Sequence, residues 1–252
     1  MNPWPALAVL CSLLYVCACI PLHKVIPWPV QLVIKVLPAL FWAAFVHRQA
    51  DSVARRFRMS IALVFCALGD GFLGCPVLGA NGFTLGLGAF LSAHLCFIAT
   101  FAPERDRSLS RRQTCRRMLP YLCLFCLMYS LLFPKLLGVM RFAVAAYALA
   151  LCSMAASTAL RRGASPGDSY WSAVVGSSFF LATDSLLSVF HFKAFGPAPY
   201  LVPQWAVIVT YYCALAGLAR SKMAARPVED ERDYSTLPSE PSAPQVVVRS
   251  SP

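Results

Sequence analysis

The chain has 252 residues, of which 58% are hydrophobic and only 13% are charged, and its mean hydropathy is +0.63. A soluble protein of this length leaves roughly a quarter to a third of its unfolded surface exposed to water, and these few charged residues cannot cover such a surface. The formal net charge is +11, but the arginines form short clusters between apolar segments, which argues against a nucleic-acid-binding face. These figures exclude an ordinary soluble globule and predict an integral membrane protein.

In chain order, eight apolar segments approach or exceed the length needed to cross ~30 Å of hydrocarbon. They comprise residues 5–20, 29–47, 59–75, 82–101, 118–134, 138–160, 169–192 and 200–219. The first segment lacks the basic flank of a signal peptide, so we expect it to remain in the protein as a helix. The sequence therefore predicts an all-α polytopic domain of about eight transmembrane helices over residues 1–226.

The basic residues alternate between the two ends of these expected helices. Fifteen Lys and Arg residues fall in the connections after the second, fourth and sixth segments and after the eighth, against four in the other connections. Because basic loops stay in the cytosol, this alternation predicts cytosolic N- and C-termini. Residues 227–252 contain five Pro and five Ser and are expected to form a disordered cytosolic tail.

The cysteines give no sign of a disulfide framework or a metal site, and the chain lacks the common motifs of soluble enzymes. The eleven cysteines lie mostly within apolar segments, so a disulfide framework is not expected. Cys123 and Cys126 form a CxxC without a second pair, which favours packing over metal binding. The chain has no Gly-rich phosphate loop, HExxH or GxSxG motif. The familiar signatures of soluble enzymes are therefore absent.

Four ionisable side chains fall inside the apolar segments: Lys35, Asp70, His94 and Asp184. Each costs several kcal/mol in lipid unless it faces a polar cavity or a partner. At ~1.5 Å per residue, Asp70 and Asp184 lie roughly 18 and 22 Å from the cytosolic ends of their segments. We expect the four groups to meet in the middle-to-outer half of the bundle. A purely structural ion pair, a snorkelling lysine and a satisfied core histidine are the alternatives.

Other polar side chains reach the same level of the membrane. Ser177 shares a helix face with Asp184, because the two residues lie seven positions apart. The supporting candidates are Tyr147, Ser177, Tyr211 and Tyr212, although tyrosines are also ordinary packing residues in such bundles. Gly69 and Gly71 flank Asp70 and would allow another backbone or side chain to approach closely. Together these residues predict a polar cavity around the two carboxyl groups.

Six short strings of residues resemble the YhhN-like lysoplasmalogenases, which are multi-spanning membrane enzymes that cleave the vinyl ether of lysoplasmalogens. The strings occur in the family's order and span most of the bundle: residues 34–38 (IKVLP), 67–70 (ALGD), 88–94 (GAFLSAH), 144–147 (VAAY), 176–184 (GSSFFLATD) and 209–212 (VTYY). The chain departs from the usual pattern at Thr183, Phe97 and Cys213. The aspartate, histidine and lysine positions are retained.

The resemblance implies a hydrolase that releases a fatty aldehyde and a glycerophospho head group in the endoplasmic reticulum membrane. It implies a lysophospholipid substrate taken from the membrane, water as the second substrate, and no metal or organic cofactor. The catalytic residues that it implies are Asp70, Asp184 and His94. Lys35 would support them by keeping one carboxylate ionised or by receiving the phosphate.

The chemistry of a vinyl ether explains why two carboxyl groups would serve. Protonation of the β-carbon gives an oxocarbenium ion, which captures water and collapses to an aldehyde and an alcohol. Burial favours the protonated form of a carboxyl group, while a second, ionised carboxylate can stabilise the cation, as in the two-carboxylate glycosidases. The sequence leaves open which aspartate is the acid.

Two other classes of function fit the same buried residues. A proton-coupled transporter or a lipid carrier would also need buried Asp, His and Lys, although we find no internal repeat of the kind common in transporters. A noncatalytic assembly partner could use the same groups as ion pairs between helices.

Overall fold

The computed structural model describes residues 3–49, 53–192 and 204–222, and these form helices with no β-strand among them. The helices are α1 (Trp4–Leu14), continued by a π-helical turn (Tyr15–Cys19), α2 (Trp28–Gln49), α3 (Val53–Gly74), α4 (Ala80–Phe101), α5 (Arg111–Leu132), α6 (Val139–Ala159), α7 (Gly167–His191) and α8 (Gln204–Arg220). Three short 3₁₀ turns lie at Pro76–Leu78, Ala102–Glu104 and Phe133–Lys135. The prediction of an all-helical membrane protein is confirmed. The predicted tail, 227–252, lies outside the described residues.

Six of these helices are long and apolar enough to cross a membrane. They are Trp28–Gln49, Val53–Gly74, Ala80–Glu104, Arg111–Lys135, Val139–Ala159 and Gly167–His191, counted with their terminal turns. A helix of 22 residues is about 33 Å long, which matches the ~30 Å hydrocarbon layer. The apolar helices Trp4–Cys19 and Trp205–Arg220 are shorter, so eight transmembrane helices stay a prediction.

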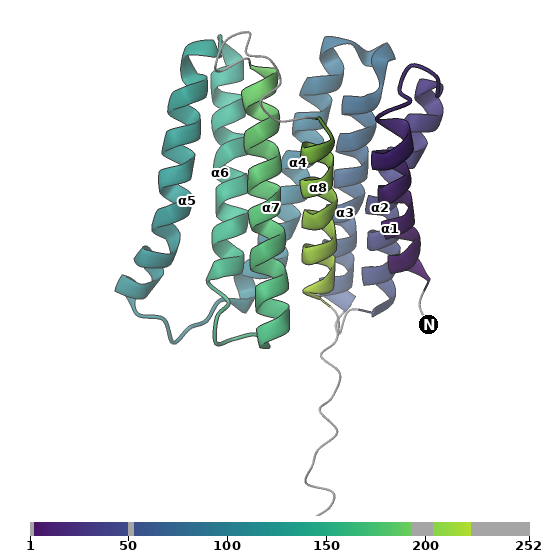
Figure 1. Ribbon diagram of the computed structural model, residues 1–252. Coiled ribbons are helices and arrows are strands. Elements are labelled where there is room, and N and C mark those ends of the chain that lie inside the picture. The colour runs from purple at the N-terminus through teal and green to yellow at the C-terminus, as the bar shows by residue number, and fades with distance from the viewer. Residues whose placement is uncertain (1–2, 50–52, 193–203, 223–252) are drawn as a thin grey trace, which may run out of the picture.

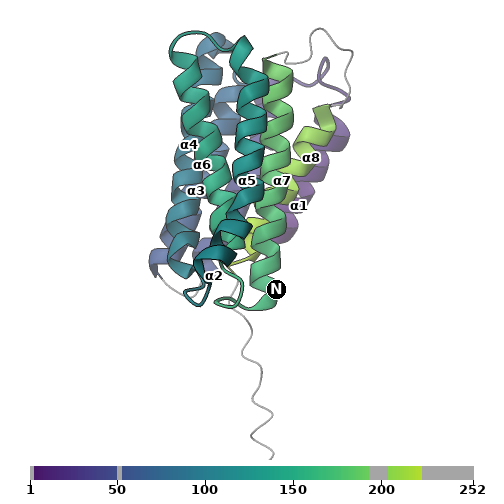
Figure 2. The same ribbon diagram turned by 90° about the vertical axis from the view of Figure 1, so that its left-hand side faces the viewer.

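The helices run side by side as one bundle (Figures 1 and 2). The closest neighbours along the chain are α1 with α2, α2 with α3, α3 with α4, and α7 with α8. Contacts of α4 with α6 and of α2 with α8 connect the two halves of the bundle. Helix α5 stands at one edge (Figure 1), packs mainly on α6 and buries only Thr114 and Leu132. Exposed apolar side chains of α5, such as Leu119, Leu122 and Leu127, are free to face lipid.

Several arginines that the sequence assigns to loops lie in helices instead. Arg55, Arg56 and Arg58 fall in the first two turns of α3. In α5 the helix begins at Arg111, where Ser110 and Gln113 form a reciprocal capping box. A hydropathy profile detects only the apolar part of a helix. The helix itself can begin outside the lipid, because arginine is a good helix former and a capping box can start a helix in a polar segment.

The base-rich connections nevertheless gather at one end of the bundle. The end of α2 and the start of α3 lie there, together with the connections from α4 to α5 and from α6 to α7, the start of α1 and the end of α8 (Figure 1, lower end). We call this the base-rich end. The cytosolic placement of this end stays a prediction of the charge rule.

An ion-pair cluster ties four chain segments together at the base-rich end. Glu104, after α4, pairs with Lys222 at 2.5 Å, with Arg161 at 2.8 Å and with Arg55 at 3.6 Å. Phe101 lies beneath two of these cations, with its ring centre 4.6 Å from Lys222 Nζ and 5.1 Å from Arg161 Cζ. Burial lowers the pKa of Lys222 to about 8, and the Arg161 cation adds to this effect. One carboxylate thus balances three cations, two of which are nearly buried.

Two turns at the opposite end share one backbone geometry. Gly79 precedes α4 with φ +52° and ψ −133°, and Gly138 precedes α6 with φ +50° and ψ −130°. L-residues with a side chain rarely adopt such angles, so glycine is required at both positions. In each turn the glycine carbonyl accepts a hydrogen bond from the amide three residues later, in Gly82 and Arg141.

Candidate active site

Asp70 is buried near the end of α3 and has two side-chain partners from other helices. The hydroxyl of Tyr211, on α8, donates to Asp70 Oδ2 at 2.6 Å. The ammonium group of Lys35, on α2, lies 3.5 Å from Oδ1. Tyr212 in turn donates to the backbone carbonyl of Lys35 at 3.1 Å. Helices α2, α3 and α8 therefore build a first cluster, an ion pair supported by two tyrosines.

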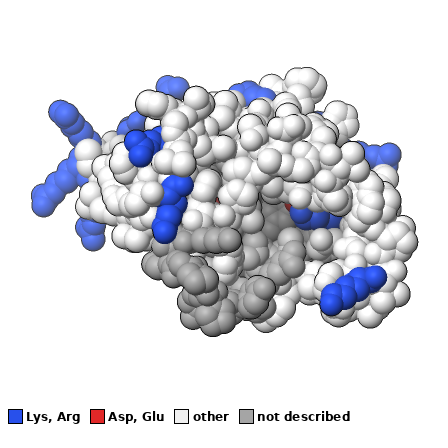
Figure 3. Space-filling model, turned by 90° about the horizontal axis from the view of Figure 1, so that it is seen from above, with Lys and Arg blue, Asp and Glu red and all other residues white. Residues whose placement is uncertain are grey.

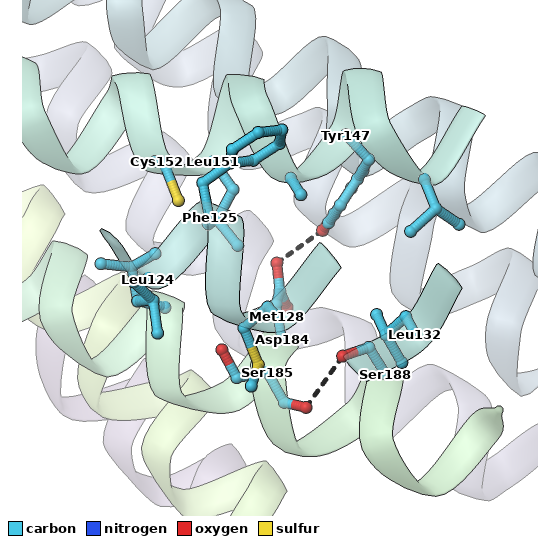
Figure 4. A pocket seen from close by; sticks show the side chains of 13 residues that line it. Leu124, Phe125, Met128, Leu132, Tyr147, Leu151, Cys152, Asp184, Ser185 and Ser188 are labelled. Atoms are coloured by element: carbon cyan, nitrogen blue, oxygen red, sulfur yellow. Dashed lines mark hydrogen bonds between the residues drawn. The ribbon is translucent and has the colours of Figure 1, made fainter. Parts of the chain in front are cut away.

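Asp184, on α7, lies in a second cluster with partners from α4 and α6. Tyr147 donates to Asp184 Oδ2 at 2.5 Å (Figure 4), and His94 Nε2 lies 3.4 Å from the same oxygen. His94 Nε2 also lies 3.2 Å from the Tyr147 hydroxyl. His94 is fully buried, and its Nδ1 has no hydrogen-bond partner among the described residues. The second cluster thus holds a carboxyl group between a phenol and an imidazole.

A buried aromatic group adjoins both clusters. The ring of Phe180 is 4.9 Å from that of His94 and 5.7 Å from that of Tyr211, and both contacts are edge to face. Phe90 packs against Phe180 and Tyr211. The Phe90 ring can lie this close to α3 only because residue 69 is glycine: a Cβ atom on Gly69 would lie 2.5 Å from the ring. The apolar wall between the two clusters thus explains one of the glycines beside Asp70.

One sequence candidate lies apart from both carboxyl groups. The Ser177 hydroxyl lies 2.8 Å from that of Thr158 and donates to the Val174 carbonyl at 3.0 Å. Ser177 lies seven positions before Asp184, which places it about 10 Å away along α7. Helix periodicity put the two residues on one face, but the neighbouring α6 supplies a partner for Ser177. The structure therefore does not bring Ser177 to the site.

The sequence predicted a polar cavity around both carboxyl groups, but the cavity between α5, α6 and α7 (Figure 4) has a mostly apolar lining that includes Asp184 and not Asp70. Its volume is about 50 Å³. Thirteen residues line it: Leu124, Phe125, Met128, Leu132, Val144, Tyr147, Ala148, Leu151, Cys152, Leu181, Asp184, Ser185 and Ser188. Most of them are ordinary apolar residues, so the sequence carried no signal for it. The cavity makes Asp184 part of a pocket wall.

The site lies toward the end of the bundle opposite the base-rich end. Seen from that end, acidic atoms show only as small spots inside hollows (Figure 3). Within residues 3–49, 53–192 and 204–222, no three His, Cys, Asp or Glu side chains lie together so as to hold a metal ion.

Comparison with known proteins gives one match. The sequence model of the YhhN family matches residues 30–222, which include Asp70, Asp184, His94 and Lys35. The chain belongs to the YhhN family. This family includes lysoplasmalogenases, so YhhN membership suggests hydrolase activity in a membrane. No curated protein and no solved structure matches the chain.

Proposed function

We propose that this YhhN protein is a lysoplasmalogenase: a membrane hydrolase that cleaves the vinyl ether bond of lysoplasmalogens to a fatty aldehyde and a glycerophospho head group. The observation that carries the proposal is the pair of buried carboxyl groups with unlike partners. Asp70 faces an ammonium group, whereas Asp184 faces a phenol and an imidazole. When two carboxyl groups lie in different environments, one can stay protonated and act as the acid while the other stays ionised and stabilises the cation that forms.

The reaction proceeds by proton transfer to carbon. One carboxyl group gives its proton to the β-carbon of the alkenyl chain, and the electron pair of the double bond forms the new C–H bond. The resulting oxocarbenium ion is stabilised by the other, ionised carboxylate and adds water at the carbon bound to oxygen. The hemiacetal then breaks its bond to the glycerol oxygen, which takes up a proton. The products are the aldehyde and the free glycerol hydroxyl.

The residues around the carboxyl groups have supporting roles in this scheme. Lys35 provides the counter-charge of Asp70, and Tyr211 fixes the orientation of that carboxyl group by a short hydrogen bond. Tyr147 and His94 do the same for Asp184, and the imidazole can also relay a proton. These contacts hold the reacting groups in place before the substrate binds.

The partners in this proposal are a lysophospholipid within the membrane and water, and the location is the endoplasmic reticulum membrane. A proton-coupled transporter or lipid carrier would use the same buried groups but would leave the lipid intact. The test therefore looks for chemical conversion.

Purified protein in detergent is incubated with a lyso vinyl-ether lipid in deuterium oxide, and the aldehyde is analysed by mass spectrometry. We expect an aldehyde with one deuterium at the carbon next to the carbonyl, and no cleavage of the matching acyl lysolipid. Intact lipid, or an aldehyde without deuterium after correction for solvent exchange, would refute the proposal.

Amide variants test the two carboxyl groups. Asp70→Asn and Asp184→Asn should each abolish turnover while the protein stays folded, because an amide keeps the shape but cannot deliver a proton or balance a cation. His94→Ala should reduce turnover severely. Asp168→Asn is the matched control, since Asp168 is exposed in the first turn of α7, and it should keep wild-type activity. Full activity in either of the first two variants would return that aspartate to a structural role.

A further inference from the structure

The cavity beside Asp184 has the composition of a hydrocarbon-binding slot. Its apolar lining comes from three helices: α5 contributes Leu124, Phe125 and Met128, and Leu151 and Leu181 come from α6 and α7. The polar atoms in its wall belong mainly to Tyr147, Asp184 and two serines, of which Ser188 donates to the Ser185 carbonyl within α7. Pockets for apolar ligands combine such a lining with a few placed polar groups.

The slot distinguishes the two carboxyl groups. Asp184 forms part of its wall, whereas Asp70 does not. Asp70 lies in the other cluster, where its two oxygens contact Lys35 and Tyr211 from α2 and α8. A chain in the slot would therefore bring its carbons to Asp184 and not to Asp70.

From these observations we propose that the slot between α5, α6 and α7 binds the single alkenyl chain of the lysolipid and that Asp184 is the group that protonates its β-carbon. This proposal rests on the proposed function. The Asp184 O–H bond breaks as the C–H bond forms, and the Asp184 carboxylate recovers a proton from the water that adds to the cation. Asp70, outside the slot and paired with Lys35, is the ionised carboxylate of the scheme.

The size and position of the slot fit one chain. A volume of about 50 Å³ has room for a few chain carbons at a time, since one water needs about 10–15 Å³ on this measure. A diacyl lipid would present two chains to this narrow space. The outer wall is α5, the edge helix whose buried residues are Thr114 and Leu132, so a longer chain can enter from the lipid side by displacing α5.

The polar atoms of the slot give the chain a direction. Ser185 and Ser188 lie beyond Asp184, toward the end of α7, while Leu181 and Leu151 lie on the other side. The glycerol side of the substrate therefore points toward the serines and the end of α7. The hydrocarbon runs past the leucines toward the middle of the bundle.

A photoreactive lysolipid tests the placement without requiring turnover. The probe is a saturated ether lysolipid with a diazirine at the second chain carbon, the position that a vinyl ether would protonate. After irradiation of the whole protein in detergent, we expect peptide mass spectrometry to find the label on the α7 peptide that contains Asp184. Label on the α3 peptide that contains Asp70, or absence of label from α5, α6 and α7, would overturn the proposal.

A matched pair of substitutions on α6 tests the slot by kinetics. Ala148→Phe fills it, whereas Ala146→Phe places the same side chain on an exposed position two residues away. Because the added ring takes the space of the chain, we expect a loss of about tenfold in kcat/KM for long-chain lysoplasmalogen, which corresponds to ~1.4 kcal/mol. The loss should shrink for short chains, and Ala146→Phe should stay near wild type. Equal effects of the two variants at every chain length would refute the slot.

An enlarging substitution guards against a simple folding defect. Met128→Ala removes volume from the α5 wall and should shift the preference toward longer or bulkier chains, which a damaged protein would not do. An unchanged chain-length profile would count against the slot. Label on α7 without aldehyde production would support the chain-binding slot and contradict the proposed hydrolase activity. Hydrolysis of the lysoplasmalogen, with label outside α5, α6 and α7, would support the hydrolase activity and contradict the slot.

Discussion

The carboxylate of Glu104, whose side chain is 19% exposed, provides a sharp test of what holds the bundle together at the base-rich end. In Glu104→Gln the side chain keeps its shape, but three cations lose their shared anion. The pair with Arg55 involves a side chain that is 41% exposed, and such pairs contribute only ~0–1 kcal/mol. The side chains of Arg161 and Lys222 are only 2% and 3% exposed, and removal of one partner from a buried pair costs ~3–5 kcal/mol.

We therefore expect Glu104→Gln to lower the free energy of unfolding by about 4 kcal/mol, measured by denaturant or thermal unfolding in a fixed detergent. Asp106→Asn is the control, because it makes the same change two residues later on an exposed loop. There Ser108 hydrogen bonds hold the pKa of Asp106 below its usual range, and an amide oxygen can still accept them. If both variants unfold alike, the cluster does not carry the stability that we assign to it.

Three further predictions concern other parts of the molecule. Gly69→Ala should cost ~1–3 kcal/mol of stability and reduce turnover, because its Cβ would strike Phe90, whereas Gly71→Ala, with nothing within 4 Å, should be neutral; equal unfolding midpoints would refute this. The pKa of Lys222 is about 8 when folded against 10.5 ordinarily, so from about pH 8 to pH 10.5 the folded state has lost a proton that the unfolded state keeps. The free energy of unfolding should therefore rise with pH across that window. If it falls instead, and falls equally in Lys222→Met, the prediction is wrong. The exposed Cys115, at the base-rich end, should react with a membrane-impermeant thiol reagent in intact microsomes, whose outer face is the cytosolic one, and labelling only after the vesicles are opened would reverse the predicted orientation.

The helical membrane fold could be predicted because two independent features of the sequence indicate it: the long apolar segments and the alternation of basic residues between their ends. The helix boundaries could not. The polar first turns of α3 and α5 resemble loops in a hydropathy profile, and only the local backbone and the Ser110 cap make them helical. The lengths of the shorter helices were also hidden, since an apolar segment does not show where its hydrogen bonding stops.

The candidate site was visible for a different reason. A charge in lipid is so costly that Lys35, Asp70, His94 and Asp184 stand out without any structure. Their pairing was not visible, because it depends on which helices adjoin: α2 and α8 bring Lys35 and Tyr211 to Asp70, while α4 and α6 bring His94 and Tyr147 to Asp184. Neither the slot nor the Glu104 cluster could be predicted from spacing, since both are assembled from residues of distant segments.

The two glycine turns bear on how the chain enters the bilayer. Under the charge rule, the turns at Gly79 and Gly138 lie on the far side and must cross the hydrocarbon during insertion, where an unsatisfied backbone group is very costly. Each turn brings its own hydrogen bonds: Gly79 N–H donates to the Pro76 carbonyl, and each glycine carbonyl is engaged as described above. The α3–α4 turn also has no charged side chain, whereas the α5–α6 turn carries Lys135. The first turn therefore takes no charge across the hydrocarbon, whereas the second has to take the ammonium group of Lys135 with it.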